Sequence, residues 1–206
     1  MSLRKRDRPP GFIEPCLPSP GAKLPVHGAW LHEVKIDGYR LLARRDATGV
    51  RLFTRHATDW TARFPIVAAA IAGLPCASCL IDGEVAAPDA AGLPSFDALR
   101  RRAPAMLFAF DLIELDGRDL RHEPIEARKA ALVELVTAPK APGIIFNEHI
   151  EGPAQEIFEH ACRLGYEGIV CKRMGSRYAS GRSTDWLKLK NPDSAAVRRE
   201  REIKRR

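Results

Sequence analysis

The stretch His32-Glu33-Val34-Lys35-Ile36-Asp37-Gly38-Tyr39-Arg40 organises the interpretation of the whole chain. Lys35 stands between two apolar residues of a strand-like run, and an Asp-Gly pair that is typical of a turn follows it. Glycine at such a turn lets a ligand approach the backbone closely. A lysine attacks only as the neutral amine, so a catalytic role requires partial desolvation and cationic neighbours. On these residues alone Lys35 is a candidate nucleophile, and a surface lysine in a hairpin is the alternative.

Composition limits the class of protein. With 206 residues, 45% of them hydrophobic, the chain can bury the core of one domain. Lys and Arg total 33 against 26 acidic residues, and the net charge of +7 favours a polyanionic partner. The longest apolar run, residues 66–74, is too short to span a bilayer and no leader precedes it, so no membrane partner and a cytoplasmic location are expected.

Cysteine usage indicates a reducing compartment. Five cysteines, an odd number scattered through apolar segments, argue against a disulfide framework. The sequence Cys76-Ala-Ser-Cys79 has redox or zinc spacing, but no second pair or histidine cluster accompanies it in the sequence. No metal is assigned to it.

The pattern of apolar residues predicts hairpins interspersed with single helices. Residues 1–28 are rich in proline, begin with basic residues and predict an extended arm. Helical spacing predicts helices at 59–74, with an Asp or Thr cap, and around 125–136 and 157–164, and Ser95 is expected to cap a short helix through residue 102. Strands are expected as a meander over 30–54, as a pair over 79–87, and at 105–115, 168–172 and 186–190. This order favours an α+β fold with largely antiparallel sheets.

Several segments in the second half of the chain carry charged residues in unusual positions. Glu167 enters the apolar run Gly168-Ile169-Val170-Cys171-Lys172, which suggests a ligand. In Trp186-Leu187-Lys188-Leu189-Lys190, strand alternation places Lys188 and Lys190 on one face, where they form either a phosphate site or an ordinary exposed edge.

The segment Lys35-Ile-Asp37-Gly38-Tyr-Arg40 resembles the first motif of the covalent nucleotidyltransferases, the superfamily of ATP-dependent DNA ligases, RNA ligases and mRNA capping enzymes. The resemblance is closest to the ligase domain of bacterial end-joining DNA ligases and covers residues 12–192 approximately. Later motifs follow in family order as Phe53-Thr54-Arg55-His56, Asp82-Gly83-Glu84, Phe108-Ala-Phe110-Asp111, Glu167-Gly168-Ile169-Val170-Cys171-Lys172 and Trp186-Leu187-Lys188-Leu189-Lys190. The resemblance implies a nucleotidyltransferase fold, in which helices flank mainly antiparallel sheets and the nucleotide site lies between the sheets.

The resemblance also implies a role for each matching residue. Lys35 would be the catalytic nucleophile that takes AMP from ATP. Glu167, assisted by Glu84, would bind Mg²⁺ or Mn²⁺. Asp37 and Arg40 would orient the lysine and contact sugar or phosphate, Phe110 would stack on adenine, and Lys188 and Lys190 would bind the α-phosphate and favour the neutral amine of Lys35. The residues expected to bind the nucleotide are Glu33, Asp37, Arg40, Arg55, Glu84, Phe110, Lys172, Lys188 and Lys190.

Each assignment has a structural alternative. A phenylalanine in a strand is more often core than a base platform, an arginine after a strand is normally a solvated charge, and Asp-Gly-Glu by itself indicates a turn. Phe108 is expected in the core. His56 stands where the family usually shows a small polar residue or asparagine.

The expected domain organisation is a basic arm at 1–28, an adenylation domain at 29–192 and a basic tail at 193–206, helical or disordered. Family ligases continue after the fifth motif into an OB-fold domain. Here residues 191–206 follow that motif, and they are too few to form such a domain. The expectation is therefore a stand-alone adenylation domain, whose activity is weak or depends on a partner. Expected partners are ATP, nicked or broken double-stranded DNA and other end-joining or repair proteins, at the nucleoid. The alternatives are a non-catalytic DNA-end or nucleotide-binding module, and an RNA ligase or capping-type nucleotidyltransferase.

Overall fold

A computed structural model describes residues 8–101, 103–137 and 142–205 of the chain. The strands are β1 (Cys16–Pro20), β2 (Trp30–Val34), β3 (Tyr39–Asp46), β4 (Gly49–Thr54), β5 (Cys79–Pro88), β6 (Pro94–Ser95), β7 (Met106–Leu115), β8 (Arg118–Asp119), β9 (Ile144–Phe146), β10 (His149–Ile150), β11 (Gly168–Arg173) and β12 (Gly181–Lys190). The helices are α1 (Pro65–Ala72), α2 (Phe96–Arg100), α3 (Ile125–Thr137), α4 (Ala154–Arg163) and α5 (Ala195–Arg205), with a 3-10 turn η1 (Thr61–Arg63).

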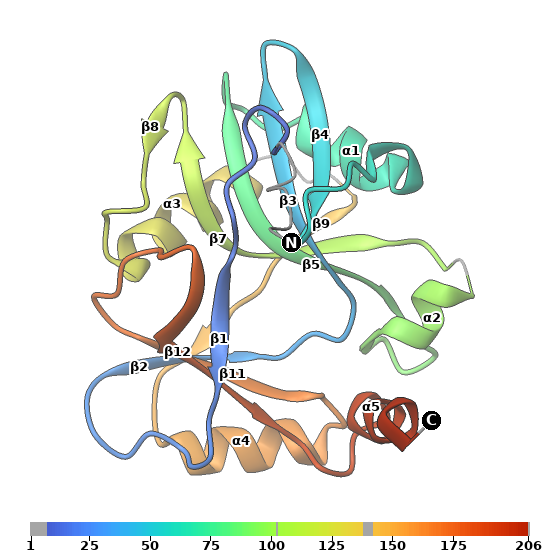
Figure 1. The fold of residues 1–206 in the computed structure, drawn as a ribbon, viewed down its shortest axis with the longest axis vertical. Coiled ribbons are helices and arrows are strands. Elements are labelled where there is room, and N and C mark those ends of the chain that lie inside the picture. Colours follow the sequence, from blue (N-terminus) through green and yellow to red (C-terminus); the bar gives the residue numbers. More distant parts are fainter. Residues whose placement is uncertain (1–7, 102, 138–141, 206) are drawn as a thin grey trace, which may run out of the picture.

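The strands of the described residues form two sheets that pack on each other (Figure 1). The lower sheet has the order β1-β12-β11-β2-β10, and the upper sheet has the order β4-β3-β5-β7-β8, with β6 beside β5 and β9 beside β7. Two pairs, β1 with β12 and β7 with β9, are parallel, and the other pairs are antiparallel. The prediction of an α+β fold with mainly antiparallel sheets is confirmed.

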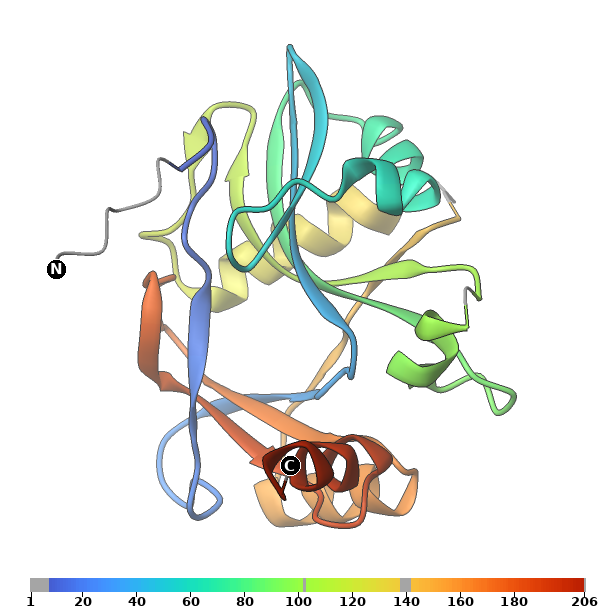
Figure 2. The same cartoon turned by 45° about the vertical axis from the view of Figure 1, so that its right-hand side comes forward.

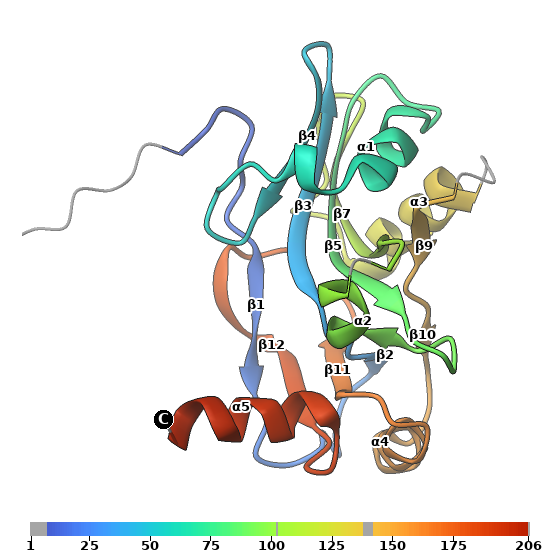
Figure 3. The same ribbon diagram turned by 90° about the vertical axis from the view of Figure 1, so that its right-hand side faces the viewer.

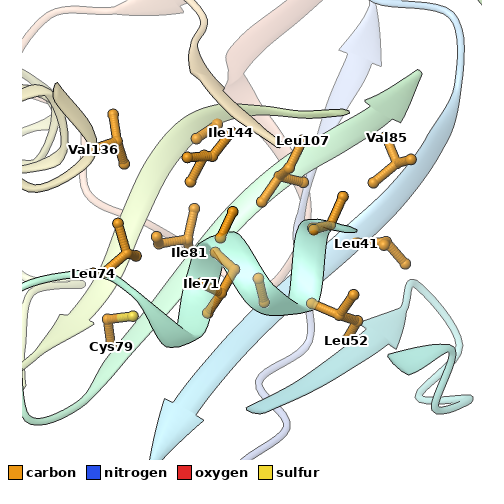
Figure 4. Close-up of a cluster of buried hydrophobic side chains, with 14 of the residues drawn as sticks. Leu41, Leu52, Ile71, Leu74, Cys79, Ile81, Val85, Leu107, Val136 and Ile144 are labelled. Carbon is orange, nitrogen blue, oxygen red and sulfur yellow. The ribbon is translucent and has the colours of Figure 1, made fainter. Parts of the chain in front are cut away.

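Three apolar clusters hold the layers together. The largest lies between the upper sheet and helices α1 and α3, and it contains Ile71 of α1 and Val136 of α3 together with Ile81 and Leu107 of the sheet (Figure 4). A second cluster fills the space between the two sheets and includes Trp186 of the lower sheet. The third lies between the lower sheet and α4. Because the upper sheet is covered on both faces, its central strand β5 is buried along almost its whole length.

The chain passes from the lower sheet to the upper sheet at the stretch that contains Lys35. Strand β2 lies in the lower sheet and β3 in the upper one, and the Lys35 N–H still donates to the Gly168 carbonyl at 2.9 Å. At Gly38 a Cβ atom would lie 2.0 Å from the Val85 carbonyl oxygen, so only glycine fits this crossing. Lys35 is thereby placed at the junction of the two sheets.

The predicted meander over residues 30–54 is wrong in one respect. The hairpin of β3 and β4 forms around a turn in which the Asp46 carboxylate accepts hydrogen bonds from Thr48, as the sequence predicts. Strand β2 does not pair with β3, because the Gly38 crossing carries the chain into the other sheet. The predicted strand pair at 79–87 is also one continuous strand, β5, with irregular register against β7 at Asp82 and Gly83.

Helix α1 is shorter than the helix predicted at 59–74. Asp59 and Thr61 instead stabilise the preceding turn, where the Asp59 carboxylate accepts from the backbone and hydroxyl of Thr61. The residue before a proline is disfavoured in the helical region of backbone angles. The helix therefore begins at Pro65, and the non-helical Phe64 is its N-cap. The predicted cap by Ser95 is confirmed, since its side chain accepts from the Ala98 N–H.

Both ends of the described chain have regular structure. Strand β1, within the predicted arm, pairs with β12 (Figure 2), and the basic tail contains helix α5, which lies near α2 (Figure 3). The part of the arm before residue 8 lies outside the described residues. No helix within the described ranges is long and apolar enough to cross a membrane. The division into arm, domain and tail stays a prediction.

Candidate active site

Lys35 lies in the loop between the sheets and contacts an acidic residue from the far end of the chain. Its Nζ lies 2.5 Å from Oε2 of Glu167, which directly precedes β11 and is 6% exposed. At Gly168 a Cβ atom would lie 2.0 Å from the Leu189 carbonyl oxygen, so glycine permits the close approach of the backbones beside Glu167. Two glycines thus fix the segments that carry the two interacting side chains.

The two lysines of β12 lie on the same side of this pair. Lys190 Nζ is 3.4 Å from the other oxygen of Glu167, and it also pairs with Glu200 of α5. Burial lowers the pKa of Lys188, and the charges of Lys190 and Lys35 lower it further. The alternation of β12 therefore brings both lysines to the neighbourhood of Lys35, as the sequence predicts.

A second carboxyl group, that of Glu84 on β5, lies close to Lys35. Glu84 is the register partner of Arg40 on β3. Burial raises the pKa of Glu84 to about 7, an effect that Lys35 and Arg40 oppose and that Glu167 and Asp82 reinforce. A carboxyl group with this pKa ionises easily when a cation approaches.

A pocket between the two sheets opens next to Lys35. Side chains from both sheets and from the loop before β3 line it: Pro18, Glu33, Val34, Lys35, Ile36, Arg40, Glu84, Phe110, Asn147, Val170, Lys172 and Trp186. Six residues predicted from the sequence, Glu33, Lys35, Arg40, Glu84, Phe110 and Lys172, are therefore brought together in one pocket.

The inner end of the pocket is a buried charge network around Glu33. Its carboxylate lies 2.6 Å from Lys129 Nζ and 2.8 Å from Lys172 Nζ, and Asn147 donates to it at 3.4 Å. Burial alone raises the pKa of Glu33, but Lys172 and Lys129 outweigh burial and hold the pKa below its usual value. A carboxylate that lies between ammonium and amide groups is a fixed polar surface on which a base can be recognised.

Phe110 lies on the wall of the pocket. It is 8% exposed, and the Arg40 guanidinium and the Lys172 ammonium lie 4.7 Å and 4.6 Å from its ring centroid. Arg40 itself is held by Asp82, which accepts from both Nε and Nη2 at 2.6 Å. The adenine-stacking role of Phe110 stays a prediction, and the location that it requires is present.

Five predicted residues are not among those that line this pocket. Glu167 and Lys190 form ion pairs next to Lys35, and Lys188 is close to them. The other two are Asp37 and Arg55. Asp37 was expected to orient Lys35, but its carboxylate lies 2.5 Å from Arg199, because α5 inserts this arginine between Asp37 and Asp97. Lys35 contacts Glu167, and the role predicted for Asp37 in orienting the lysine stays a prediction. Arg55 is exposed in the turn after β4 and is not among the residues that line the pocket. Its nucleotide-binding role stays a prediction.

Sequence reasoning missed four residues of the site. Lys129 lies on helix α3, where a lysine ordinarily faces solvent, and Asn147 lies between two short strands without any motif. Asp82 was part of a matched segment, but no role was assigned to it. Pro18 reaches the pocket only because β1 pairs with β12. Lys129, Asn147 and Pro18 carry no local sequence signal, because their positions in the site depend on tertiary contacts.

The carboxylates fit a divalent metal ion that arrives with a nucleotide. Across the described residues, no group of three or more His, Cys, Asp or Glu side chains is arranged to hold a metal. Mg²⁺ is commonly bound by only one or two carboxylates together with substrate phosphates. Glu84 and Glu167, which are both close to Lys35 and to each other, supply this number.

The raised pKa of Glu84 predicts a pH-dependent stability of the metal-free protein. The folded state binds more protons than the unfolded chain between the ordinary pKa of Glu84 and its raised value of about 7. The free energy of unfolding of the wild type, measured relative to Glu84→Gln, should therefore fall as the pH rises through this interval, by about 3 kcal/mol. Urea denaturation of both proteins in EDTA, at several pH values, measures this difference. The prediction is contradicted if the free energies of unfolding of the two proteins change equally with pH over the interval.

Two packed sheets with a pocket between them, and a lysine close to two carboxylates, form the arrangement expected of a covalent nucleotidyltransferase domain. The family model described as "ATP dependent DNA ligase domain" matches residues 23–190, and the chain belongs to this family. The recognition made from the motifs is thereby confirmed.

Named relatives agree with the family. The chain is 39% identical over 187 residues to the multifunctional non-homologous end joining protein LigD of Pseudomonas aeruginosa, covering 88% of this chain and 22% of that protein. It is 35% identical over 172 residues to LigD of Mycobacterium tuberculosis, covering 82% of this chain and 22% of that protein. It therefore spans about a fifth of the length of these relatives.

Solved structures share the fold. The ligase domain of M. tuberculosis LigD matches with a TM-score of 0.75 and 34% identity over 85% of this chain and 60% of that chain. A mycobacterial DNA ligase D complexed with ATP and MES matches with a TM-score of 0.72 and 32% identity, over 85% of this chain and 59% of that chain. The predicted nucleotidyltransferase fold is confirmed.

Proposed function

We propose that the chain is the adenylation domain of an ATP-dependent DNA ligase. The meeting of Lys35, Glu84, Glu167 and Lys190, from four separate segments, beside a pocket that Lys35 and Glu84 line supports this proposal most directly. The neutral amine of Lys35 attacks the α-phosphorus of ATP. A phosphorus–nitrogen bond forms, the bond to pyrophosphate breaks, and the amine loses a proton.

The charges around Lys35 suit this step. Lys188 and Lys190 neutralise the negative charge of the phosphates, and Glu167 fixes the position of the amine. A Mg²⁺ or Mn²⁺ ion held by Glu167 and Glu84 would stabilise charge on the phosphate oxygens. Glu33, Lys172 and Phe110 line the part of the pocket that remains for the base.

Two further steps complete nick or break sealing in DNA repair or recombination. The AMP on Lys35 passes to a DNA 5′-phosphate, which frees the lysine, and a 3′-hydroxyl then displaces AMP to form the phosphodiester bond. The net charge of +7 suits a DNA substrate. Relatives named for non-homologous end joining support other end-joining or repair proteins as partners, and a location at the cytoplasmic nucleoid.

The test is the covalent intermediate itself. The wild type is incubated with ATP and Mg²⁺, its intact mass is measured, and the modified peptide is mapped. We expect a gain of one AMP at Lys35, with release of pyrophosphate. If the wild type gains no adduct and the purified protein carries no AMP already bound to it, the proposal is overturned.

Parallel reactions separate the alternatives. A GTP adduct in place of the ATP adduct would identify a capping-type enzyme, and preference for nicked RNA over nicked DNA would identify an RNA ligase. Salt-sensitive DNA binding without an adduct or nick closure would identify a non-catalytic DNA-end module.

A further inference from the structure

Tyr178, in the loop between β11 and β12, belongs to a closed ring of buried hydrogen bonds beside the nucleotide pocket. Its hydroxyl donates to Asp82 Oδ2 at 2.6 Å and accepts from the Cys16 N–H at 3.0 Å. Arg40 Nη2 donates to Asp82 and, at 2.8 Å, to the Cys16 carbonyl. Cys16 and Asp82 are 0% exposed and Tyr178 is 4% exposed, so these three members are shielded from water, while the Arg40 side chain is 15% exposed at the pocket.

The ring joins the parts of the chain that form one wall of the pocket. Arg40 lies over Phe110 and lines the pocket, and Pro18, two residues after Cys16 on β1, lines it too. The Tyr178 ring also packs edge-on against Trp186, with centroids 5.9 Å apart, and Trp186 is another lining residue. Tyr178 itself is not among the lining residues, so its effect on a nucleotide acts through its neighbours.

Removal of the Tyr178 hydroxyl would loosen both strand β1, through Cys16, and the Asp82 carboxylate that holds Arg40. The Cys16 N–H would lose its acceptor in a buried place, and Asp82 would lose one of the donors that fix its carboxylate. A long arginine side chain has high rotamer entropy, so the orientation of Arg40 depends on the orientation of Asp82. Burial raises the pKa of Tyr178 well above its usual value, and the hydroxyl therefore remains a donor throughout the neutral range.

We propose that Tyr178 is a positioning residue for nucleotide binding, which holds Arg40 and strand β1 in one arrangement so that the pocket wall is formed before ATP arrives. This inference rests on the proposed function. Preorganisation reduces the cost of binding, so its loss weakens the affinity for the nucleotide and leaves the chemistry at Lys35 unchanged.

The test compares Tyr178→Phe with the wild type and with Tyr166→Phe. Tyr166→Phe removes a hydroxyl from a ring that packs against the cluster of Trp30 and Ile169 under the lower sheet, so it is a matched control. Calorimetry with α,β-methylene-ATP, which cannot transfer AMP, gives Kd. We expect Kd to rise roughly tenfold in Tyr178→Phe, with the rate of adduct formation at saturating ATP within about twofold of the wild type. Tyr166→Phe should match the wild type.

Three results would overturn the inference: an unchanged Kd in folded Tyr178→Phe, a loss of the saturating rate without a change in Kd, and an equal change in Tyr166→Phe. Hydrogen exchange adds a second readout, because the peptide that contains Cys16 should exchange faster in Tyr178→Phe. If this variant does not fold, Asp82→Asn keeps the size of the side chain while weakening its hold on Arg40, and an unchanged Kd there also overturns the inference.

The two proposals fail separately. A wild type that binds the analogue but forms no adduct contradicts the ligase function, while the comparison of Kd values still decides the role of Tyr178. A wild type that forms the adduct, together with equal Kd values, contradicts only the positioning role.

Discussion

In Lys35→Arg and in Lys35→Ala, the rate of AMP-adduct formation should fall about 10⁴-fold or more relative to the wild type, so that no adduct is detected. The reaction needs a neutral nitrogen at the position now 2.5 Å from Glu167. Alanine removes the nitrogen. Arginine retains a charge for Glu167 but does not deprotonate in proteins, so it cannot attack the α-phosphorus. Adduct formation is measured by intact mass after incubation with ATP and Mg²⁺.

The arginine variant separates loss of chemistry from loss of structure. It can still pair with Glu167, so its thermal stability and its affinity for α,β-methylene-ATP should remain close to those of the wild type. A matched control is Lys23→Arg, which replaces an exposed lysine outside the pocket and should leave adduct formation unchanged. An adduct of normal yield on Lys35→Arg would assign the nucleophile to another residue.

The sequence predicts the chemistry of the site better than its architecture. Lys35 and Glu167 meet because glycines on either side permit unusually close backbone contacts, and both glycines lie within the motifs. Strand alternation in turn correctly places Lys188 and Lys190 on one face. Local sequence patterns are enough to predict these residues as neighbours, because the reactive side chains and the glycines that position them lie within the same short motifs.

Features that depend on contacts between distant segments were not predictable. Asp37 pairs with Arg199 only because α5 packs near α2, and the charged sequence of that helix does not specify where it packs. Lys129 is 1% exposed because Glu33 lies opposite it across the fold, although its own helix gives no sign of burial. The passage of the chain from one sheet to the other at Gly38 was not predictable for the same reason. A strand pattern indicates that a segment is a strand, but it does not identify the neighbouring strand.

The ion pair of Asp111 and Arg128 predicts the largest stability effect in the chain. Both side chains are 0% exposed, and Arg128 Nε and Nη2 donate to the two carboxylate oxygens at 2.7 Å and 2.9 Å. Arg128 Nη1 also donates to the carbonyls of Glu123 and Ser176, so one guanidinium links strand β7 to helix α3 and to the loop before Tyr178. Removal of the carboxylate leaves a buried positive charge without a counterion.

We therefore expect Asp111→Ala to lower the free energy of unfolding by about 3–5 kcal/mol, a large fraction of the stability of an ordinary domain. The double variant Asp111→Leu with Arg128→Met should recover a substantial part of this loss, because it removes both charges from the interior. Recovery should stop short of the wild type, since the Glu123 and Ser176 carbonyls lose their donor. Urea denaturation measures all three proteins, with the slope checked for two-state behaviour.

An exposed pair of the same geometry provides the control. Arg121 donates to both oxygens of Asp119, but their side chains are 37% and 44% exposed. Solvent already screens these charges, so Asp119→Ala should cost about 1 kcal/mol or less. Equal losses from Asp119→Ala and Asp111→Ala would show that burial does not set the strength of the Asp111 pair. A double variant no more stable than Asp111→Ala would show that the loss arises from the missing hydrogen bonds of Arg128 rather than from its uncompensated charge.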